Sequence, residues 1–464
     1  MLLIDDEADN ASINTSKNKI TAINNHIRNI LKLFKKNAYV GYTATPFANV
    51  FIPIDEQGDI FPRDFIINLP APSNYIGPEQ VFGFSPLEED EFSETVLPIT
   101  HKIEDAETFI PNAHTNKTAP DSSELPDSLQ LAIKSFIITC AIRRLRGQEK
   151  AHNSMLIHIT RYTVWQKHTF ECVQATFDKY NNAIKLNDID IFEEFRQVFE
   201  GNIPNHKNFV QVSAQILDYS LNSLDAQIQV HTWEDVKNEL YKACSKIQIR
   251  IINGGSKDTL EYFNHKDGLS VIAIGGDKLS RGLTLEGLSV SYFLRASKMY
   301  DTLMQMGRWF GYRQGYVDLC RLFTTRQLNE WFCHITMASE ELRKEFDYMT
   351  NVAGATPEKY ALKVRTHPDL LQITASNKLR DVKNIQVSFS ARLVETYEFV
   401  KNKAIFKQNF AHTHQFIEDL GKNETDNFPK DFVWKNISAS KIIAFLSNYQ
   451  VEKDQPLKKA EPSF

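Results

Sequence analysis

Short apolar segments separated by helical stretches fill the middle of this chain. They are Met155–Ile159, Ile247–Ile252, Val271–Ile274, Val290–Leu294 and Val317–Phe323. Short apolar runs are typical of buried strands, and their alternation with helices predicts a parallel sheet covered by helices on both faces. The chain is therefore expected to have an α/β fold.

The start of the chain has the same pattern on a smaller scale. Met1–Ile4 is expected to form a strand, the apolar positions of Ile20–Phe34 recur at helical spacing, and Ala38–Tyr42 is expected to form a second strand. The segment Thr43–Pro46 then marks a turn, because proline cannot continue a sheet ladder. The opening is therefore predicted as strand, helix, strand and turn.

Composition and periodicity indicate four parts. Residues 85–126 are acidic and rich in Pro, Ser and Thr, which indicates a linker or an insertion. Residues 1–84 are expected to form a partial first lobe and residues 127–330 a second lobe. Residues 331–464, a helical stretch followed by an alternating run, are expected to form a C-terminal α+β accessory domain.

The overall composition excludes several classes of protein. The net charge of −5 means that any nucleic-acid surface must be local. The five cysteines show no paired close spacing, which argues against a disulfide framework or a zinc cluster and favours the reduced cytosol. No apolar run approaches the roughly 20 residues that cross a bilayer, and no signal peptide is evident. A cytoplasmic protein that is not embedded in a membrane is expected.

Carboxylates follow the first expected strand, in the sequence Asp6-Glu7-Ala8-Asp9. ATP hydrolysis uses such residues, one carboxylate to hold Mg²⁺ through water and a second to orient and deprotonate the attacking water. The hydroxyls of Thr43 and Thr45, after the next strand, could hydrogen-bond these carboxylates. Solvated acids at a strand end and an ordinary turn would use the same residues, so neither motif is specific alone.

Two further motifs lie in the expected second lobe. The sequence GGDKLSRGLT, residues 275–284, follows a strand, and its glycines permit close backbone approach while Asp277 and Arg281 offer polar contacts. Downstream, QMGRWFGYR contains Arg308 and Arg313. A guanidinium can stabilise charge on a transferred phosphoryl group, so either could act as an arginine finger. A solvent-exposed helix that carries arginines would have the same sequence without any catalytic role.

The segments IDDEADN, GYTATPFANV, FPRDFIINLP with SNYIG, SMLIH, GGDKLSRGLTLEG and QMGRWFGYR together resemble the Z1 domain family. That family is labelled as endonuclease and is associated with bacterial restriction and phage-defence loci. The resemblance covers roughly residues 1–330 and is most specific at residues 1–60 and 270–325. The family core is similar to superfamily-two helicases, which implies two RecA-like parallel-sheet lobes, the first of them incomplete here.

The resemblance implies a nucleic-acid-dependent ATPase or translocase subunit with ATP and Mg²⁺ as cofactors. Its implied partners are nucleic acid, with DNA expected, and other subunits of a restriction system. The catalytic residues would be the base Glu7 with Arg308 and Arg313 at the γ-phosphate. The cofactor-binding residues would be Asp6, which would also bind the metal, and Thr43, Thr45, Asp277, Arg281 and Gly282. Thr43 and Thr45 would couple nucleotide state to substrate.

Three features depart from that pattern. Thr284 stands where many relatives of the helicase core have aspartate, and the spacing of Arg308 and Arg313 leaves open which one is the finger. The sequence also has no Gly-x-x-x-x-Gly-Lys-Ser/Thr loop to cradle phosphates, and residues 253–257 lack its spacing. ATP affinity should therefore be low, and we expect a truncated or mis-started polypeptide that is inactive as this chain.

Two alternatives stay open. An endonuclease has little support, because Pro368-Asp369 is not followed by Glu-x-Lys at a useful distance, and His412 and His414 are expected to be surface residues. A non-enzymatic remnant could still bind nucleic acid or protein. Arg143, Arg144, Arg146 and the lysines of residues 32–36 could contact phosphates, although cations at helix C-termini are favoured in any case.

Overall fold

The structure is a computed structural model of the 464-residue chain. It describes residues 1–16, 19–52, 59–84, 96–111, 113–118, 120, 122–204, 206–218, 227–253, 260–276, 279, 283–295, 297–351, 353–360, 362, 364–365, 371–374, 378, 402–421, 434 and 437–450. The chain divides into two compact units, Met1–Val382 and Lys383–Phe464. Among the described residues, no helix is long and apolar enough to cross a bilayer.

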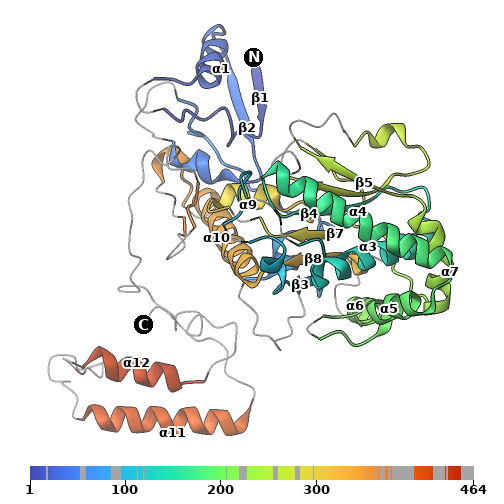
Figure 1. The fold of residues 1–464 in the computed structure, drawn as a ribbon. Helices are drawn as coiled ribbons and strands as arrows, with labels where there is room; N and C mark the ends of the chain where they lie inside the picture. Colours follow the sequence, from blue (N-terminus) through green and yellow to red (C-terminus); the bar gives the residue numbers. More distant parts are fainter. Residues whose placement is uncertain are drawn as a thin grey trace. The chain divides into compact units, whose positions relative to one another are not determined.

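A six-stranded parallel sheet forms the centre of the first unit (Figure 1). Its strands, in spatial order, are β3 (Thr100–Lys102), β8 (Arg321–Thr324), β7 (Leu288–Phe293), β4 (Asn153–His158), β6 (Ser270–Gly275) and β5 (Ile247–Ile252). Every residue of β4, β6 and β7 is buried. Burial on both faces explains why these strands are largely apolar, and the predicted parallel α/β sheet is confirmed.

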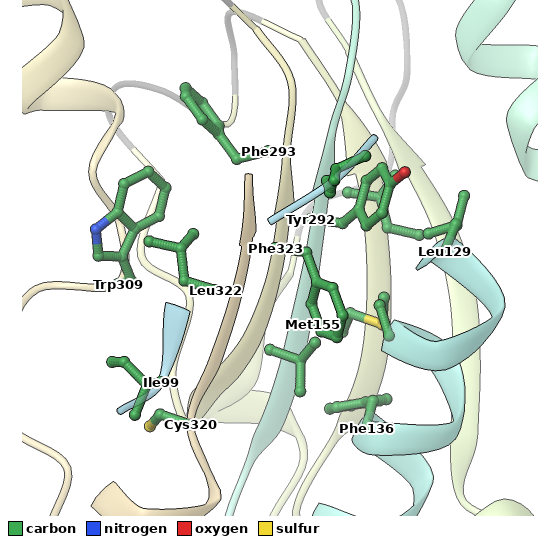
Figure 2. Close-up of a cluster of buried hydrophobic side chains, with 14 of the residues drawn as sticks. Ile99, Leu129, Phe136, Met155, Tyr292, Phe293, Trp309, Cys320, Leu322 and Phe323 are labelled. Atoms are coloured by element: carbon green, nitrogen blue, oxygen red, sulfur yellow. The ribbon is translucent and has the colours of Figure 1, made fainter. Parts of the chain in front are cut away.

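Neighbouring residues of the central strands pack into opposite sides of the sheet (Figure 2). On one side, Tyr292 and Phe323 lie near Leu129 and Phe136 of α3 (Asp127–Leu145). On the other side, Phe293 packs against Trp309, with ring centroids 5.1 Å apart.

The remaining helices of the first unit follow the expected alternation. They are α2 (Pro78–Phe82), α4 (Thr163–Lys185), α5 (Ile189–Glu200), α6 (Phe209–Asp218), α7 (Trp233–Cys244), α9 (Tyr300–Met306) and α10 (Arg326–Asn351). Helix α3 makes its largest helix contact with α7, and α10 packs on α2. The stacked rings of Phe82 and Phe332, 4.7 Å apart, hold the second of these contacts.

A second, two-stranded parallel sheet is built from the start of the chain. Strand β1 (Leu2–Asp6) pairs with β2 (Ala38–Tyr42), and α1 (Ala22–Lys32) connects them. This confirms the predicted strand, helix and strand. The 3₁₀ helix η1 (Pro46–Phe51) follows, and its Ala48 packs with Ile13 in a small separate core.

Helix α1 exposes apolar residues and buries polar ones. Asn24 and Arg28 are buried, and Arg28 Nη2 lies 2.8 Å from the carboxylate of Asp59. Ile23 and Ile30 are exposed instead. On β1, Leu2 and Ile4 share one face and are 60% and 62% exposed. The outward surface of this small sheet is therefore unusually apolar.

Several elements differ from the sequence expectation in extent. Strand β3 and the 3₁₀ helix η2 (Ala106–Thr108) lie inside the segment expected to be a linker, so part of that segment is an edge of the main sheet. Three residues are too few to show a period in the sequence. The expected strand Val317–Phe323 begins as the 3₁₀ helix η5 (Val317–Leu319), and only its second half joins β8.

The second unit contains α11 (Lys403–Leu420) and α12 (Ala439–Asn448). Phe416 and Phe445 stack between them at 4.3 Å, and His412 Nε2 lies 3.2 Å from the Phe445 carbonyl. The alternating run expected after residue 384 lies outside the described residues, so an α+β domain stays a prediction. Helix α10, which crosses the expected boundary at residue 331, belongs to the first unit.

Candidate functional site

The carboxylates of Asp6 and Glu7 stand at the end of β1, where the backbone turns sharply. Glu7 has a φ of 57°, in the left-handed region that glutamate rarely adopts. The turn is closed by a hydrogen bond of 2.9 Å from the Asn10 amide to the Glu7 carbonyl. Asp6 and Glu7 are exposed, whereas Ala8 and Asp9 are buried. The strained backbone at Glu7 thus lets Asp6 and Glu7 face outward while Asp9 faces inward.

The buried carboxylate of Asp9 collects three hydrogen bonds. Thr43 Oγ1 donates to Oδ1 at 2.8 Å, and Thr45 Oγ1 donates to Oδ2 at 2.9 Å. Gln305 Nε2 also donates to Oδ2, at 3.2 Å. The two threonines therefore contact the fourth residue of the acidic motif, whereas Asp6 and Glu7 face outward. Asp9 was given no role from the sequence, because alternation alone does not show which acid turns inward.

These hydrogen bonds connect the small sheet to the part of the chain that carries the arginines. Gln305 lies on α9, next to the segment with Arg308, and 296 positions separate it from Asp9. Beside it, the rings of Phe47 and Tyr300 meet edge to face at 5.7 Å. We call Asp9, Thr43, Thr45 and Gln305 the Asp9 junction.

Arg308 lies on the far side of this junction and interacts with Glu7. Its guanidinium is half-buried and donates a hydrogen bond to the Leu283 carbonyl. Burial lowers the pKa of Arg308, and the negative charge of Glu7 opposes that shift. The Glu7 carboxylate therefore lies near enough to the Arg308 guanidinium to influence its pKa.

Arg313 has a different role from Arg308, because its guanidinium hydrogen-bonds main-chain carbonyls of the turn that precedes it. Nη1 donates to the Tyr312 carbonyl at 2.8 Å, and Nη2 approaches the carbonyls of Arg308, Trp309 and Phe310 at 3.1–3.3 Å. Gly311 bonds in both directions with Ile76, from the segment SNYIG. Gly311 has a φ of 131°, which disfavours any other residue there. Arg313 therefore stabilises the turn that follows Arg308.

The glycine-rich segment begins with two residues that serve packing. A Cβ at Gly275 would lie 2.1 Å from the Ile252 carbonyl oxygen, and a Cβ at Gly276 would lie 2.6 Å from Gln166 Nε2. Gly275 is required because the backbone of the neighbouring strand approaches it closely, whereas a side chain at position 276 would displace the Gln166 amide group. Asp277, Arg281 and Gly282, predicted to contact nucleotide or nucleic acid, lie outside the described residues.

The arginines at the end of α3 make internal contacts. Arg146 Nη1 and Nη2 bind the two carboxylate oxygens of Asp318 at 2.7 and 2.8 Å. Arg144 Nε bonds Glu239 at 2.9 Å, and the Arg143 guanidinium lies 4.1 Å from the ring centre of Tyr316. These contacts favour the structural explanation of the three arginines. The lysines at positions 32, 35 and 36 are exposed.

The chemistry of the outward carboxylates suits a magnesium ion better than a zinc ion. Asp6 and Glu7 offer only oxygen donors, which Mg²⁺ prefers, and both are exposed enough to bind it through water. No cluster of three or more His, Cys, Asp or Glu side chains occurs among the described residues. The cavity of about 540 Å³ lined by Asp105, Ser128 and His206 includes no residue of the Asp9 junction.

Comparison with known proteins identifies a family. A family model, the Z1 domain, matches residues 128–371, more than half of the chain. The match includes the segments of Gly275 and Arg308 but begins after Asp6, Glu7 and the two threonines. No curated protein and no solved structure matches.

Proposed function

Since this chain belongs to the Z1 domain family, we propose that it is a nucleic-acid-dependent ATPase or translocase subunit of a bacterial restriction or phage-defence system. The Asp9 junction carries the proposal. It brings an acidic motif, a hydroxyl motif and an arginine-bearing segment to one place, although nearly 300 positions separate them. The two parallel sheets are proposed to belong to two RecA-like lobes of the superfamily-two type.

In the proposed reaction, the outward carboxylates act on water and metal. Glu7 would orient the attacking water and accept its proton, and Asp6 is the residue that would hold Mg²⁺. When bound, Mg²⁺ would neutralise charge on the phosphates. Arg308 is proposed to donate hydrogen bonds to the γ-phosphoryl oxygens, because the charge of Glu7 already influences the pKa of its guanidinium. Arg313 is the weaker candidate, because its donors face carbonyls of its own turn.

The Asp9 junction is proposed to transmit the state of the nucleotide. Asp9, which lies two residues after Glu7, accepts hydrogen bonds from Thr43 and Thr45. It also accepts one from Gln305, which lies three residues before Arg308. A shift of either catalytic residue would therefore strain the same hydrogen bonds. Asp277, Arg281 and Gly282 remain proposed contacts to nucleotide or DNA.

A non-enzymatic binding protein is the second candidate. It is favoured by the absence of a phosphate-binding loop from the sequence, since such a loop supplies much of the affinity for ATP. In that case the junction would hold the fold together without turnover. No contact among the described residues favours an endonuclease.

Turnover of ATP by the full chain, measured with and without duplex DNA, tests the proposal. The missing phosphate-binding loop predicts that turnover by this chain is very low or absent. Any turnover should be stimulated by DNA and abolished by Glu7→Gln, because this change removes the base and nearly preserves shape. Arg308→Gln should lose turnover as well. If the unaltered chain hydrolyses no ATP with or without DNA, these 464 residues are not an ATPase and the binding function is favoured.

A further inference from the structure

A short segment beyond α10 returns to the candidate site. Gln372 pairs with Met299 in parallel, and its amide donates to the Lys298 carbonyl at 2.6 Å. The Tyr300 amide in turn donates to the Gln372 carbonyl at 3.0 Å. Leu371 and Ile373 on either side are buried in the main hydrophobic core. The chain is therefore anchored beside the start of α9.

The anchored segment reaches a second buried carboxylate, that of Asp301 on α9. Asp301 is 3% exposed, and its Oδ1 accepts a hydrogen bond of 2.6 Å from the Thr302 amide. Its Oδ2 accepts one of 2.8 Å from Thr374 Oγ1. Asp301 and Asp9 are thus two buried acids on the two sides of the junction. Buried carboxylates are costly unless cations or hydrogen-bond donors compensate them.

Lys378 lies between these two acids. Its Nζ donates a hydrogen bond of 2.7 Å to the main-chain carbonyl of Asp9 and lies 3.9 Å from Oδ2 of Asp301. The Lys378 side chain is 12% exposed, so solvent screens its charge little. One ammonium group therefore ties the turn that carries Glu7 to the helix that leads to Arg308.

We propose that Lys378 is a positioning residue of this site. By holding the Asp9 carbonyl against Asp301, it fixes the Glu7 turn relative to α9 and sets the separation of Glu7 from Arg308. The consequence for catalysis rests on the proposed ATPase function, whereas the fixing of the turn does not. The proposal gives a structural role to residues 371–374 and 378, all but the first of which lie beyond the family match.

Hydrogen exchange of the full chain without nucleotide tests the first half of the proposal. In Lys378→Met, amides of residues 1–16 and 298–306 should exchange faster by about tenfold or more, because a charged hydrogen bond is lost. Lys378→Arg should restore much of the protection. Lys344→Met is the matched control, because Lys344 is an exposed lysine of α10 whose ion pair with Glu340 lies at the surface. Unchanged exchange in Lys378→Met would overturn the proposal.

ATP turnover tests the second half. We expect kcat to fall by about tenfold or more in Lys378→Met, with a smaller change in KM for ATP and partial rescue by Lys378→Arg. A Lys378→Met chain that exchanges faster yet turns over ATP at the normal rate would show that Lys378 has no positioning role. If the unaltered chain has no turnover, the ATPase proposal fails, and hydrogen exchange alone decides whether Lys378 fixes the turn.

A milder variant guards against loss of folding. Thr374→Val removes only the hydroxyl that orients Asp301 toward Lys378 and keeps the shape of the side chain. It should raise exchange in residues 298–306 more than in the main sheet. If Lys378→Met does not fold and Thr374→Val leaves exchange in residues 298–306 unchanged, the proposal is wrong.

Discussion

Gln305 donates a hydrogen bond of 3.2 Å to Asp9, and the acceptor oxygen also receives the hydroxyl of Thr45. Asp9 is 1% exposed, so water cannot replace these partners. The small sheet and the arginine-bearing segment are therefore fixed to each other through one carboxylate. Asp9, the last residue of the acidic motif, is therefore the structural centre of the site.

Replacing Asp9 by asparagine should destabilise the first unit. The amide group would present hydrogen atoms to Thr43 or to Thr45 and Gln305, all of which donate to Asp9 now. We expect Asp9→Asn to lower the free energy of unfolding by about 1–3 kcal/mol, measured by urea denaturation. The control Asp6→Asn, at an exposed residue, should change it by less than about 0.5 kcal/mol. Equal effects would contradict the assignment of Asp9.

The main sheet could be predicted because its strands are buried on both faces. A continuous apolar run such as Val271–Ile274 is typical of a strand buried on both faces. The edge strand β3 was missed because three residues with one buried histidine carry no period. Strands could therefore be predicted from local composition where their side chains are buried on both faces of the sheet.

The candidate site could be predicted only in part, because its contacts are not local. The sequence motif indicates Thr43 and Thr45 but not their partner Asp9, because the backbone turn at Glu7 determines which carboxylate faces inward. Nothing near Lys378 in the sequence indicates that it reaches Asp9, 369 positions away. The different tasks of Arg308 and Arg313 likewise depend on how the backbone folds around Gly311.

Substitution by lysine should separate the two arginines of the site. One ammonium cannot reach all the carbonyls that Arg313 approaches, so Arg313→Lys should lower the free energy of unfolding by about 1–2 kcal/mol. Arg308→Lys should instead reduce ATP turnover by about 10³-fold or more, the effect typical of a lost arginine finger. Urea denaturation and steady-state turnover measure the two effects. The reverse pattern would make Arg313 the catalytic residue.

Arg146 should matter for stability more than for DNA binding. Its ion pair with Asp318 is buried, with side chains 3% and 0% exposed, so Arg146→Met removes the ion-pair partner of a buried carboxylate. We expect a loss of about 3–5 kcal/mol in the free energy of unfolding. Arg196→Met breaks an exposed pair with Glu200 and should lower the free energy of unfolding far less. If folded Arg146→Met protein shows a shallower salt dependence of DNA affinity, Arg146 contacts phosphate after all.

The apolar face of β1 should bind hydrophobic dyes. Leu2 and Ile4 lie mostly exposed on the same face, so Leu2→Ser with Ile4→Ser should weaken dye fluorescence at nearly unchanged stability. Bis-ANS titration and urea denaturation measure the two quantities. A buried pair on neighbouring strands β4 and β6, Leu156→Ser with Ala273→Ser, should unfold the protein instead. Unchanged dye binding in the surface variant would mean that the exposed face lies elsewhere.

Stability should fall in mild acid because of His158. Burial, with the nearby Arg295 charge, lowers the pKa of His158 to about 3, whereas an unfolded histidine titrates near 6.5. Between these values the unfolded state binds the extra proton, so this contribution is complete above about pH 6.5 and is lost as pH falls toward 3. From pH 6.5 to 5.5 the loss should be about 1 kcal/mol. Urea denaturation at both pH values should show a decline smaller by that amount in His158→Gln, and an identical decline in both proteins would mean that His158 can be protonated in the folded state.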